Sequence, residues 1–288
     1  MLTLRSRRLV LQLRPDLGGC VAGLHYNGVP VLRSANATAL SDVRQSACYA
    51  LVPFSNRIDR GCFLWRGRTH RVQPNFLPEP HAIHGVGWQR PWSVVSVADA
   101  QAVLRYQHQA DAAWPFAFEC QQSHQLDDDG WTASLHVTNL DTRPAPVGLG
   151  WHPYFVKRKA GHVRLKASGR WAMGPDHLPT VCEPSEGLDL GVEAMQIDHC
   201  FEEWPGQAVL RDGELNVQLS ASASRLVVFT NASKDFVALE PVSHVNNALG
   251  RQGAESDKQA WGVQVLEPGE TFDLHMSVQV AAMPSAGG

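Results

Sequence analysis

The fold is decided by the stretch Phe118-Glu119-Cys120-Gln121-Gln122-Ser123-His124-Gln125-Leu126, which reaches Asp128-Asp129-Gly130 and returns as Trp131-Thr132-Ala133-Ser134-Leu135-His136-Val137-Thr138. Apolar and polar residues alternate in both halves, the pattern of a strand with one buried face. An Asp-Gly pair between two extended segments is typical of a tight hairpin turn, because such turns favour residues that tolerate positive φ. The stretch therefore predicts an antiparallel β-hairpin in the middle of the chain.

The same alternation recurs toward both ends of the chain. Further strands are expected at 9–13, at 21–26 and 29–32 around Asn27-Gly28, and at 215–219, 225–230, 236–239, 263–266 and 272–278. No segment sustains the 3.6-residue period of a helix, and the best helical candidate, 41–50, would make a few turns at most. Crossover helices for a parallel sheet are therefore missing, and the pattern predicts antiparallel sheets throughout.

The length of 288 residues permits either one large all-β domain or two ordinary domains. No linker rich in Pro, Gly and Ser divides the middle of the chain, and predicted strands continue across every plausible boundary. We therefore expect an all-β fold, a large single-domain antiparallel β-sandwich over residues 1–282, followed by a disordered tail at residues 283–288.

The composition excludes several classes of protein. Hydrophobic residues make up 44% and charged residues 18% of the chain, enough apolar material for a core. The formal net charge of -3 offers no broad cationic surface for nucleic acid or an anionic membrane. The basic N-terminus precedes too short an apolar run for a signal peptide, and no run of about 18 apolar residues could span a bilayer. We expect a cytoplasmic protein, and the oligomeric state stays open.

The six cysteines are spaced too far apart for a C-x-x-C metal or redox motif. Buried free thiols in a reducing compartment are the simplest interpretation of this pattern.

Two segments in the first third of the chain place polar side chains beside glycines. Arg57, in Asn56-Arg57-Ile58, could serve in a structural ion pair or bind ligand oxygens. His81 and His84 have the H-x-x-H spacing of a metal site, but a Gly-rich loop and the lack of a recognisable third ligand make this the weaker interpretation. A loop imidazole could equally donate a hydrogen bond or a proton.

Two further segments hold one ionisable group each. His152 lies in Gly150-Trp151-His152-Pro153-Tyr154-Phe155, where bulky aromatics and a proline restrict its motion. Glu240 ends an apolar strand, where a carboxylate is unstable unless partners replace its hydration. Taken singly, a core histidine and a solvated glutamate are the common explanations. The functional alternatives are a proton donor and a general base.

The order of these segments and their local residue sequences resemble the aldose 1-epimerase (galactose mutarotase) family over most of the chain. The matching elements are Gly18-Gly19, Asn56-Arg57-Ile58, Gly61-x-Phe63, His84-Gly85, His152-Pro153-Tyr154-Phe155, the Asp198 region, Glu240-Pro241 and Leu266-x-Pro268-Gly269-Glu270. The His-Pro-Tyr-Phe block is the most specific of them. Departures at Val86, Trp151 and Val156 bear on sugar selectivity rather than on proton transfer.

The resemblance implies a galactose mutarotase-like supersandwich that interconverts the α and β anomers of a free aldohexose without metal or cofactor. Carried over position by position, His152 corresponds to the general acid, Glu240 to the general base and His84 to an assisting histidine. Arg57 and Asp198 correspond to residues that bind sugar hydroxyls. Ring opening removes a proton from the C1 hydroxyl while the ring oxygen gains one, so it requires one base and one acid across the sugar.

Other functions use similar residues. A non-catalytic sugar-binding sandwich would share the cleft but would not need both His152 and Glu240. A hexose-6-phosphate 1-epimerase would need a basic cluster, and Arg60, Arg66 and Arg68 form no unmistakable one. A glycosidase commonly uses two carboxylates, which would leave the histidines without a role. Three aromatic residues could cover the apolar face of a sugar: Trp88, Trp151 and Tyr154.

Overall fold

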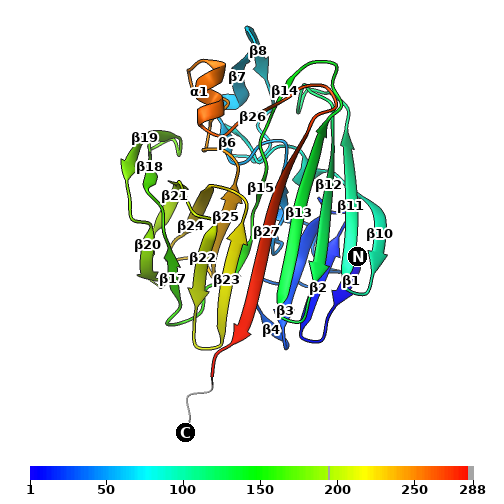
Figure 1. The fold of residues 1–288 in the computed structure, drawn as a ribbon, viewed down its shortest axis with the longest axis vertical. Helices are drawn as coiled ribbons and strands as arrows, with labels where there is room; N and C mark the ends of the chain where they lie inside the picture. Colours follow the sequence, from blue (N-terminus) through cyan, green and yellow to red (C-terminus); the bar gives the residue numbers. More distant parts are fainter. Residues whose placement is uncertain (194, 285–288) are drawn as a thin grey trace.

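The computed structural model describes residues 1–193 and 195–284, and these form antiparallel sheets packed face to face (Figure 1). Every pair of neighbouring named strands in this part of the chain is antiparallel. The predicted all-β antiparallel sandwich is therefore confirmed.

The largest sheet has nine strands and faces the viewer in Figure 1. In spatial order its strands are β10 (Ser93–Ala98), β11 (Gln101–His108), β12 (Phe118–Leu126), β13 (Gly130–Asn139), β27 (Thr271–Ala282), β23 (Leu215–Ala221), β22 (Gln207–Arg211), β17 (His162–Leu165) and β20 (Leu188–Gly191).

The predicted central hairpin is β12 and β13, whose register pairs Phe118 with Asn139 and Leu126 with Trp131. Gly130 begins β13 and is not among the glycines with positive φ, so the predicted reason for this glycine is wrong. A Cβ at Gly130 would lie 2.1 Å from the Gln279 side chain on β27, so the position needs the space. At Asn27-Gly28 both residues do have positive φ, as the tight turn between β3 and β4 requires.

Two further sheets form the second layer. A four-stranded sheet contains β1 (Leu2–Arg5), β2 (Leu9–Arg14), β3 (Cys20–Tyr26) and β4 (Val29–Pro30). An eight-stranded sheet contains β19 (Pro179–Pro184), β18 (Gly169–Met173), β21 (Ile197–Glu202), β24 (Arg225–Thr230), β25 (Phe236–Val242), β15 (Gly150–Trp151) and β5 (Ala50–Leu51), with β16 (Tyr154–Val156) also paired to β25. Isolated bridges, Val21 to Cys48 and Leu32 to Phe155, join the two sheets.

Short elements gather at one end of the sandwich, the top of Figure 1. They are the strand pairs β14 (Ala145–Val147) with β26 (Gln264–Leu266), β6 (Arg57–Ile58) with β9 (Ala82–Ile83) and β7 (Cys62–Trp65) with β8 (Arg68–Arg71), the helix α1 (Glu255–Ala260) and the 3₁₀ turns Asp59–Gly61 and Gly87–Gln89. The helical candidate at 41–50 is wrong except for one 3₁₀ turn, Val43–Gln45. The six residues of α1 are too few to give a periodic pattern, so the sequence did not reveal this helix.

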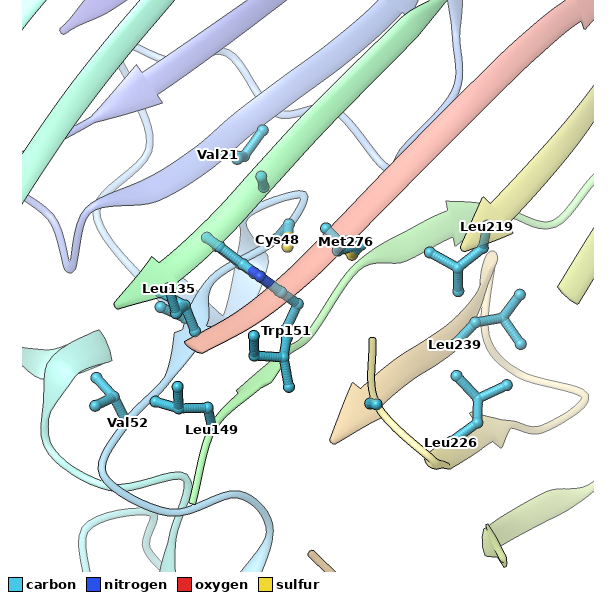
Figure 2. Close-up of a cluster of buried hydrophobic side chains, with 14 of the residues drawn as sticks. Val21, Cys48, Val52, Leu135, Leu149, Trp151, Leu219, Leu226, Leu239 and Met276 are labelled. Atoms are coloured by element: carbon cyan, nitrogen blue, oxygen red, sulfur yellow. The ribbon is translucent and has the colours of Figure 1, made fainter. Parts of the chain in front are cut away.

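The main core fills the space between the layers. Trp151 lies at its centre and is fully buried, and Figure 2 places it among side chains from both layers, including Leu135, Leu239 and Met276. The indole rings of Trp151 and Trp131 meet edge to face, with centroids 6.5 Å apart. Aromatic residues of this size bury large areas, so they contribute strongly to stability.

The alternation of side chains along β25 explains how the eight-stranded sheet also carries a site. Val237 and Leu239 point into the main core, whereas Phe236 and Ala238 belong to a second, smaller cluster on the other face. Because side chains two apart share a face, Glu240 lies on the same face as Ala238. The second face of this sheet is therefore a partly apolar surface that positions polar groups.

The cysteines and the chain end complete the comparison with the sequence. All six cysteines are free, and four are buried, but Cys62 is only half-buried and Cys182 is exposed. Met283 donates its backbone N–H to the Glu214 carbonyl at 2.8 Å, and the rest of the predicted tail from 285 onward lies outside the described residues. Among the described residues, no helix has the length and apolar character needed to cross a bilayer.

Candidate active site

A cavity of about 460 Å³ opens on the second face of the eight-stranded sheet. It brings together all five residues singled out from the sequence: Arg57, His84, His152, Asp198 and Glu240. They come from five separate segments of the chain. The volume lies within the range of small-molecule pockets.

His152 and Glu240 face each other because of strand pairing. Gly150 pairs with Val242 and Tyr154 with Ala238, so position 152 falls opposite position 240. His152 Nε2 lies 3.3 Å from Glu240 Oε1, and both side chains are buried. Within the described residues, His152 Nδ1 and Glu240 Oε2 have no hydrogen-bond partner. Buried polar atoms without partners are costly, so a small shift of either side chain that gave these atoms a polar partner would be favourable.

Burial drives the two pKa values in opposite directions. It lowers the pKa of His152 to about 3, with a further contribution from the positive charge of Arg33. It raises the pKa of Glu240 well above the usual value, with Asp198 adding to the rise and Arg57 opposing it. The empty site therefore favours a neutral imidazole beside a protonated carboxyl. Moving that proton from Glu240 to His152 gives an ion pair without changing the charge of the site.

His84 is oriented by a sharply turned backbone. His84 and Gly85 both have positive φ, 61° and 69°, and the backbone N–H of Asn56 donates to His84 Nδ1 at 3.1 Å. Because Nδ1 accepts, the ring proton of neutral His84 is on Nε2. Burial, with His152 and Arg57, lowers the pKa of His84 well below its usual value. The ring is edge-on to His152 with centroids 5.2 Å apart, so His84 is a neutral hydrogen-bond donor at the site.

Arg57 and Asp198 lie on opposite segments of the cavity wall. Arg57, in β6, donates through Nε to Glu79 Oε1 at 3.0 Å and through Nη1 to Asn56 Oδ1 at 3.3 Å. Its remaining N–H groups can donate to a ligand. Asp198, in β21, is half-buried, and its Oδ2 lies 3.8 Å from His177 Nδ1. Glu79, which holds the guanidinium in place, has no local signal in the sequence.

Two tyrosines flank the His152 ring. Tyr49 stacks on it with centroids 4.9 Å apart and Tyr154 with centroids 4.3 Å apart, and the two hydroxyls lie 3.3 Å from each other. Tyr49 precedes the short strand β5 and had no sequence signal. Trp151 adjoins His152 in an extended segment, so it points to the opposite side, into the core.

Of the three aromatic candidates, only Tyr154 lines the cavity; Trp88 is buried and packs on Tyr49 with centroids 6.0 Å apart. The other aromatic residues of the wall were missed from the sequence: Phe76, Phe229 and Phe236.

The basic residues considered for a phosphate lie elsewhere. The side chain of Arg60 is 84% exposed, and Arg66 pairs with Glu255 and Glu267. Arg68 is exposed on the β7–β8 hairpin. Three other basic residues line the cavity: Arg33, Arg44 and Lys234.

His81 and His244 also lie outside the cavity wall. His81 Nδ1 accepts from the Arg60 backbone N–H at 3.0 Å, and His244 Nε2 accepts from the Ser55 backbone N–H at 3.0 Å. Both are buried and have the structural role of core histidines.

The cavity residues could also approach a metal ion. One potential ligand atom from each of His84, His152 and Glu240 lies within 4.8 Å of the others. Two imidazoles and a carboxylate are ligands that zinc and iron accept. The same atoms of His152 and Glu240 are those that proton transfer requires, so a bound metal would compete with acid–base chemistry. The sequence spacing alone did not reveal this grouping.

Comparison with solved structures places this fold in a class. The structure of a galactose mutarotase-like protein from Clostridium acetobutylicum superposes with a TM-score of 0.84 at 20% identity, covering 98% of this chain and 95% of that one. A candidate aldose 1-epimerase from Escherichia coli K12 superposes with a TM-score of 0.87 at 27% identity, covering 98% of both chains. The fold is thus the galactose mutarotase-like β-sandwich.

Sequence comparison identifies the family. The family model for aldose 1-epimerase matches residues 1–279. The uncharacterised protein YphB of Escherichia coli K12 is 29% identical over 283 residues, which cover 92% of this chain and 93% of the relative. The uncharacterised protein YihR of the same organism is 25% identical over 216 residues, 69% of this chain and 70% of the relative. The chain belongs to the aldose 1-epimerase family.

Proposed function

We propose that this protein is an aldose 1-epimerase that interconverts the α and β anomers of a free aldose. His152 and Glu240 transfer the protons, His84 assists by donating a hydrogen bond to the ring oxygen, and Arg57 and Asp198 bind hydroxyl groups of the sugar. The observation that carries the proposal is the buried His152–Glu240 pair, 3.3 Å apart, in a cavity of sugar size.

The reaction has two mirrored halves. In ring opening, the Glu240 carboxylate takes the proton of the C1 hydroxyl, and the electrons of that O–H bond form the C1 carbonyl. The C1–O5 bond breaks, its electrons go to O5, and O5 takes a proton from His152. After rotation about C1–C2, closure returns both protons by the reverse steps, so the enzyme ends in its starting state.

Binding of the sugar makes the required protonation states accessible. In the empty cavity burial favours a protonated Glu240 and a neutral His152. Hydroxyl groups of a bound sugar can donate to Glu240 and accept from His152, and both hydrogen bonds favour the charged forms. One proton then moves over a short distance within the pair, with no exchange with solvent.

Measurement of anomer exchange tests the proposal. The protein is added in catalytic amounts to freshly dissolved α-D-glucose, α-D-galactose and other aldoses, and optical rotation is followed. We expect faster approach to the anomeric equilibrium for at least one sugar, with no new product. If every aldose relaxes at its spontaneous rate, the proposed function is wrong, and a sugar-binding protein without catalysis would fit better.

A further inference from the structure

Four basic residues line the cavity, and their charges are compensated unequally. Arg57 is paired with Glu79, with 3.0 Å between Nε and Oε1, and Arg44 binds Asp42 with 2.7 Å between Nη2 and Oδ2. Arg33 and Lys234 form no ion pair with any carboxylate among residues 1–193 and 195–284. Two positive charges in the wall therefore lack a protein counter-charge.

Both charges gather at one aromatic patch. The Arg33 guanidinium carbon lies 4.0 Å from the Tyr154 ring centroid and 4.9 Å from that of Phe236. Lys234 Nζ lies 5.8 Å from the Phe236 centroid. Cation–π contacts hold such groups without neutralising them, so an anion bound at this patch would interact favourably with both charges.

Arg33 is held rigidly in this position. Its Nε and Nη2 groups donate to the Ser46 carbonyl at 3.2 and 2.7 Å, and Nη2 also donates to the Arg44 carbonyl at 2.7 Å. Backbone carbonyls satisfy these donors but carry no full charge, and Nη1 remains available. A half-buried guanidinium fixed in this way is suited to recognising an anionic group.

The patch lies on one particular side of the reacting atoms. Tyr154, which contacts Arg33, stacks on His152, and its hydroxyl is 3.5 Å from His152 Nε2. In the proposed reaction His152 faces the ring oxygen. That oxygen is bonded to C5, which carries the terminal C6 group of an aldohexose, so a substituent at C6 extends toward Arg33 and Lys234.

We infer that the preferred substrate is an anionic aldose, with a phosphate, sulfonate or carboxylate at C6 that Arg33 and Lys234 bind. This inference rests on the proposed function, because the side of the ring is set by the role of His152. The basic residues near Arg57 that the sequence suggested for a phosphate take no part in it. Of the four cavity carboxylates, Asp42 and Glu79 are paired with arginines, Glu240 faces His152, and Asp198 lies 3.8 Å from His177 Nδ1.

Calorimetric titration separates binding from turnover. The probes are D-glucose, D-glucose 6-phosphate, D-glucuronate and 6-deoxy-6-sulfo-D-glucose, with the matching galacto sugars where they exist, all at low ionic strength. We expect at least one anionic sugar to bind about tenfold more tightly than its neutral parent. The tightest of the three identifies the anionic group. If no anionic sugar binds more tightly than its parent, the inference is wrong.

Variants that remove one positive charge then show whether Lys234 binds the anionic group of the sugar. Lys234→Gln should weaken binding of the favoured anionic sugar by about fivefold to tenfold, and Lys234→Arg, which keeps the charge, should retain most of it. Lys166→Gln is the matched control, because Lys166 is exposed and does not line the cavity. Equal losses in Lys234→Gln and Lys166→Gln, or none in Lys234→Gln, would contradict a site at Lys234.

Anomer exchange of the same sugars, measured by NMR exchange spectroscopy, distinguishes the two proposals. Fast exchange of neutral sugars that bind as well as the anionic ones overturns the anion inference and leaves the epimerase intact. Selective binding of an anionic sugar whose anomers exchange only at the spontaneous rate supports the anion site and overturns the proposed function.

Discussion

Glu240 and His152 have ordinary side chains whose chemistry is set by their surroundings. Apolar neighbours remove water from both, and the loss of hydration favours the neutral form of each. Among the described residues, each has one polar atom without a hydrogen-bond partner. The two residues therefore act as a unit that shares one proton, rather than as an acid and a base with independent pKa values.

Replacing Glu240, the proposed base, isolates its contribution. Glu240→Gln preserves shape and hydrogen bonding but cannot take a proton, so kcat should fall by ~10²–10⁴-fold with little change in sugar affinity. Turnover is measured at saturating sugar, corrected for the spontaneous rate, and the affinity is measured by calorimetry. A folded Glu240→Gln protein with near wild-type turnover would show that Glu240 is not the base.

Arg57 should behave differently, because a group that binds hydroxyls interacts with both the ground state and the transition state. Arg57→Ala should raise KM by about tenfold or more and also leave the Glu79 carboxylate without its partner. Arg57→Ala/Glu79→Gln removes that stranded charge. If the double variant regains wild-type KM, the loss in the single variant came from Glu79 and not from missing contacts to the sugar.

Metal ions test whether the atoms that could bind a metal are also needed for proton transfer. We predict that exhaustive dialysis against EDTA leaves turnover unchanged and that added Zn²⁺ inhibits, because Zn²⁺ would occupy ligand atoms of His84, His152 and Glu240. Turnover is assayed with and without each reagent, and metal content is measured by elemental analysis. Loss of activity on dialysis, restored by one metal, would contradict the acid–base mechanism as proposed.

At the scale of elements, the segment that carries His84 depends on Gly85. Gly85 has a φ of 69°, and a Cβ there would lie 2.1 Å from the Val52 carbonyl oxygen. Gly85→Ala should therefore destabilise the protein by more than about 2 kcal/mol and displace His84. Gly67→Ala is the control: Gly67 also has positive φ, but a Cβ would meet nothing within 4 Å. The Gly67→Ala variant should lose about 1 kcal/mol of stability, measured by urea unfolding. Equal losses of stability in the Gly85→Ala and Gly67→Ala variants would show that the contact with the Val52 carbonyl is not what makes Gly85 necessary.

Elements with a strong alternating pattern were predictable from the sequence. The predicted segments 118–126 and 225–230 coincide with β12 and β24. Along β12, buried positions alternate with more exposed ones. Along β24, residues of the main core alternate with residues that line the cavity. β25 was placed correctly at its start but continues through Glu240 to Val242. Glu240 was identified through the family resemblance, since a carboxylate within a buried strand violates the local pattern.

The wall of the cavity was less predictable. Arg33 and Lys234 lie about 200 positions apart in the printed sequence, and each comes from a segment without a motif. Arg33 is fixed by backbone carbonyls and aromatic rings, and these partners leave no trace in residue spacing. Tyr49 likewise meets His152 only through the pairing of β5 with β15. Such contacts depend on tertiary packing, and local sequence patterns report only on local structure.

At the scale of the whole molecule, burial of histidines links stability to pH. Burial lowers the pKa of His124 and His152 to about 3 and of His244 to about 4, and it lowers the pKa of His84 well below the usual value. In the unfolded chain each histidine binds a proton below about pH 6.5. Folding therefore excludes these protons, so each histidine stabilises the fold less as the pH falls.

Glu240 acts in the opposite direction. Its raised pKa means that the folded protein holds a proton which the unfolded chain releases above about pH 4.5. The stabilisation that Glu240 contributes therefore grows as the pH falls toward 4.5, and it offsets the destabilisation from one histidine. Between about pH 6.5 and 4.5 the unfolded chain thus binds more protons than the folded one, because several histidines act against the single Glu240. Each such proton changes stability by about 1.4 kcal/mol per pH unit.

We therefore predict that the free energy of unfolding falls as the pH drops below 6.5, by about 1.4 kcal/mol per pH unit for each proton that only the unfolded chain binds. The measurement is the free energy of unfolding in urea at pH 7.5, 6.0 and 5.5. The His124→Asn variant tests one of these histidines separately, because His124 does not line the cavity. His124 accepts from Trp131 Nε1 at 3.3 Å, and an amide oxygen can also accept. In this variant the free energy of unfolding should change less with pH, by the amount that corresponds to about one proton, while turnover at neutral pH is retained. Stability that is independent of pH between 7.5 and 5.5 would contradict the prediction, because it would mean that the buried histidines become protonated without unfolding.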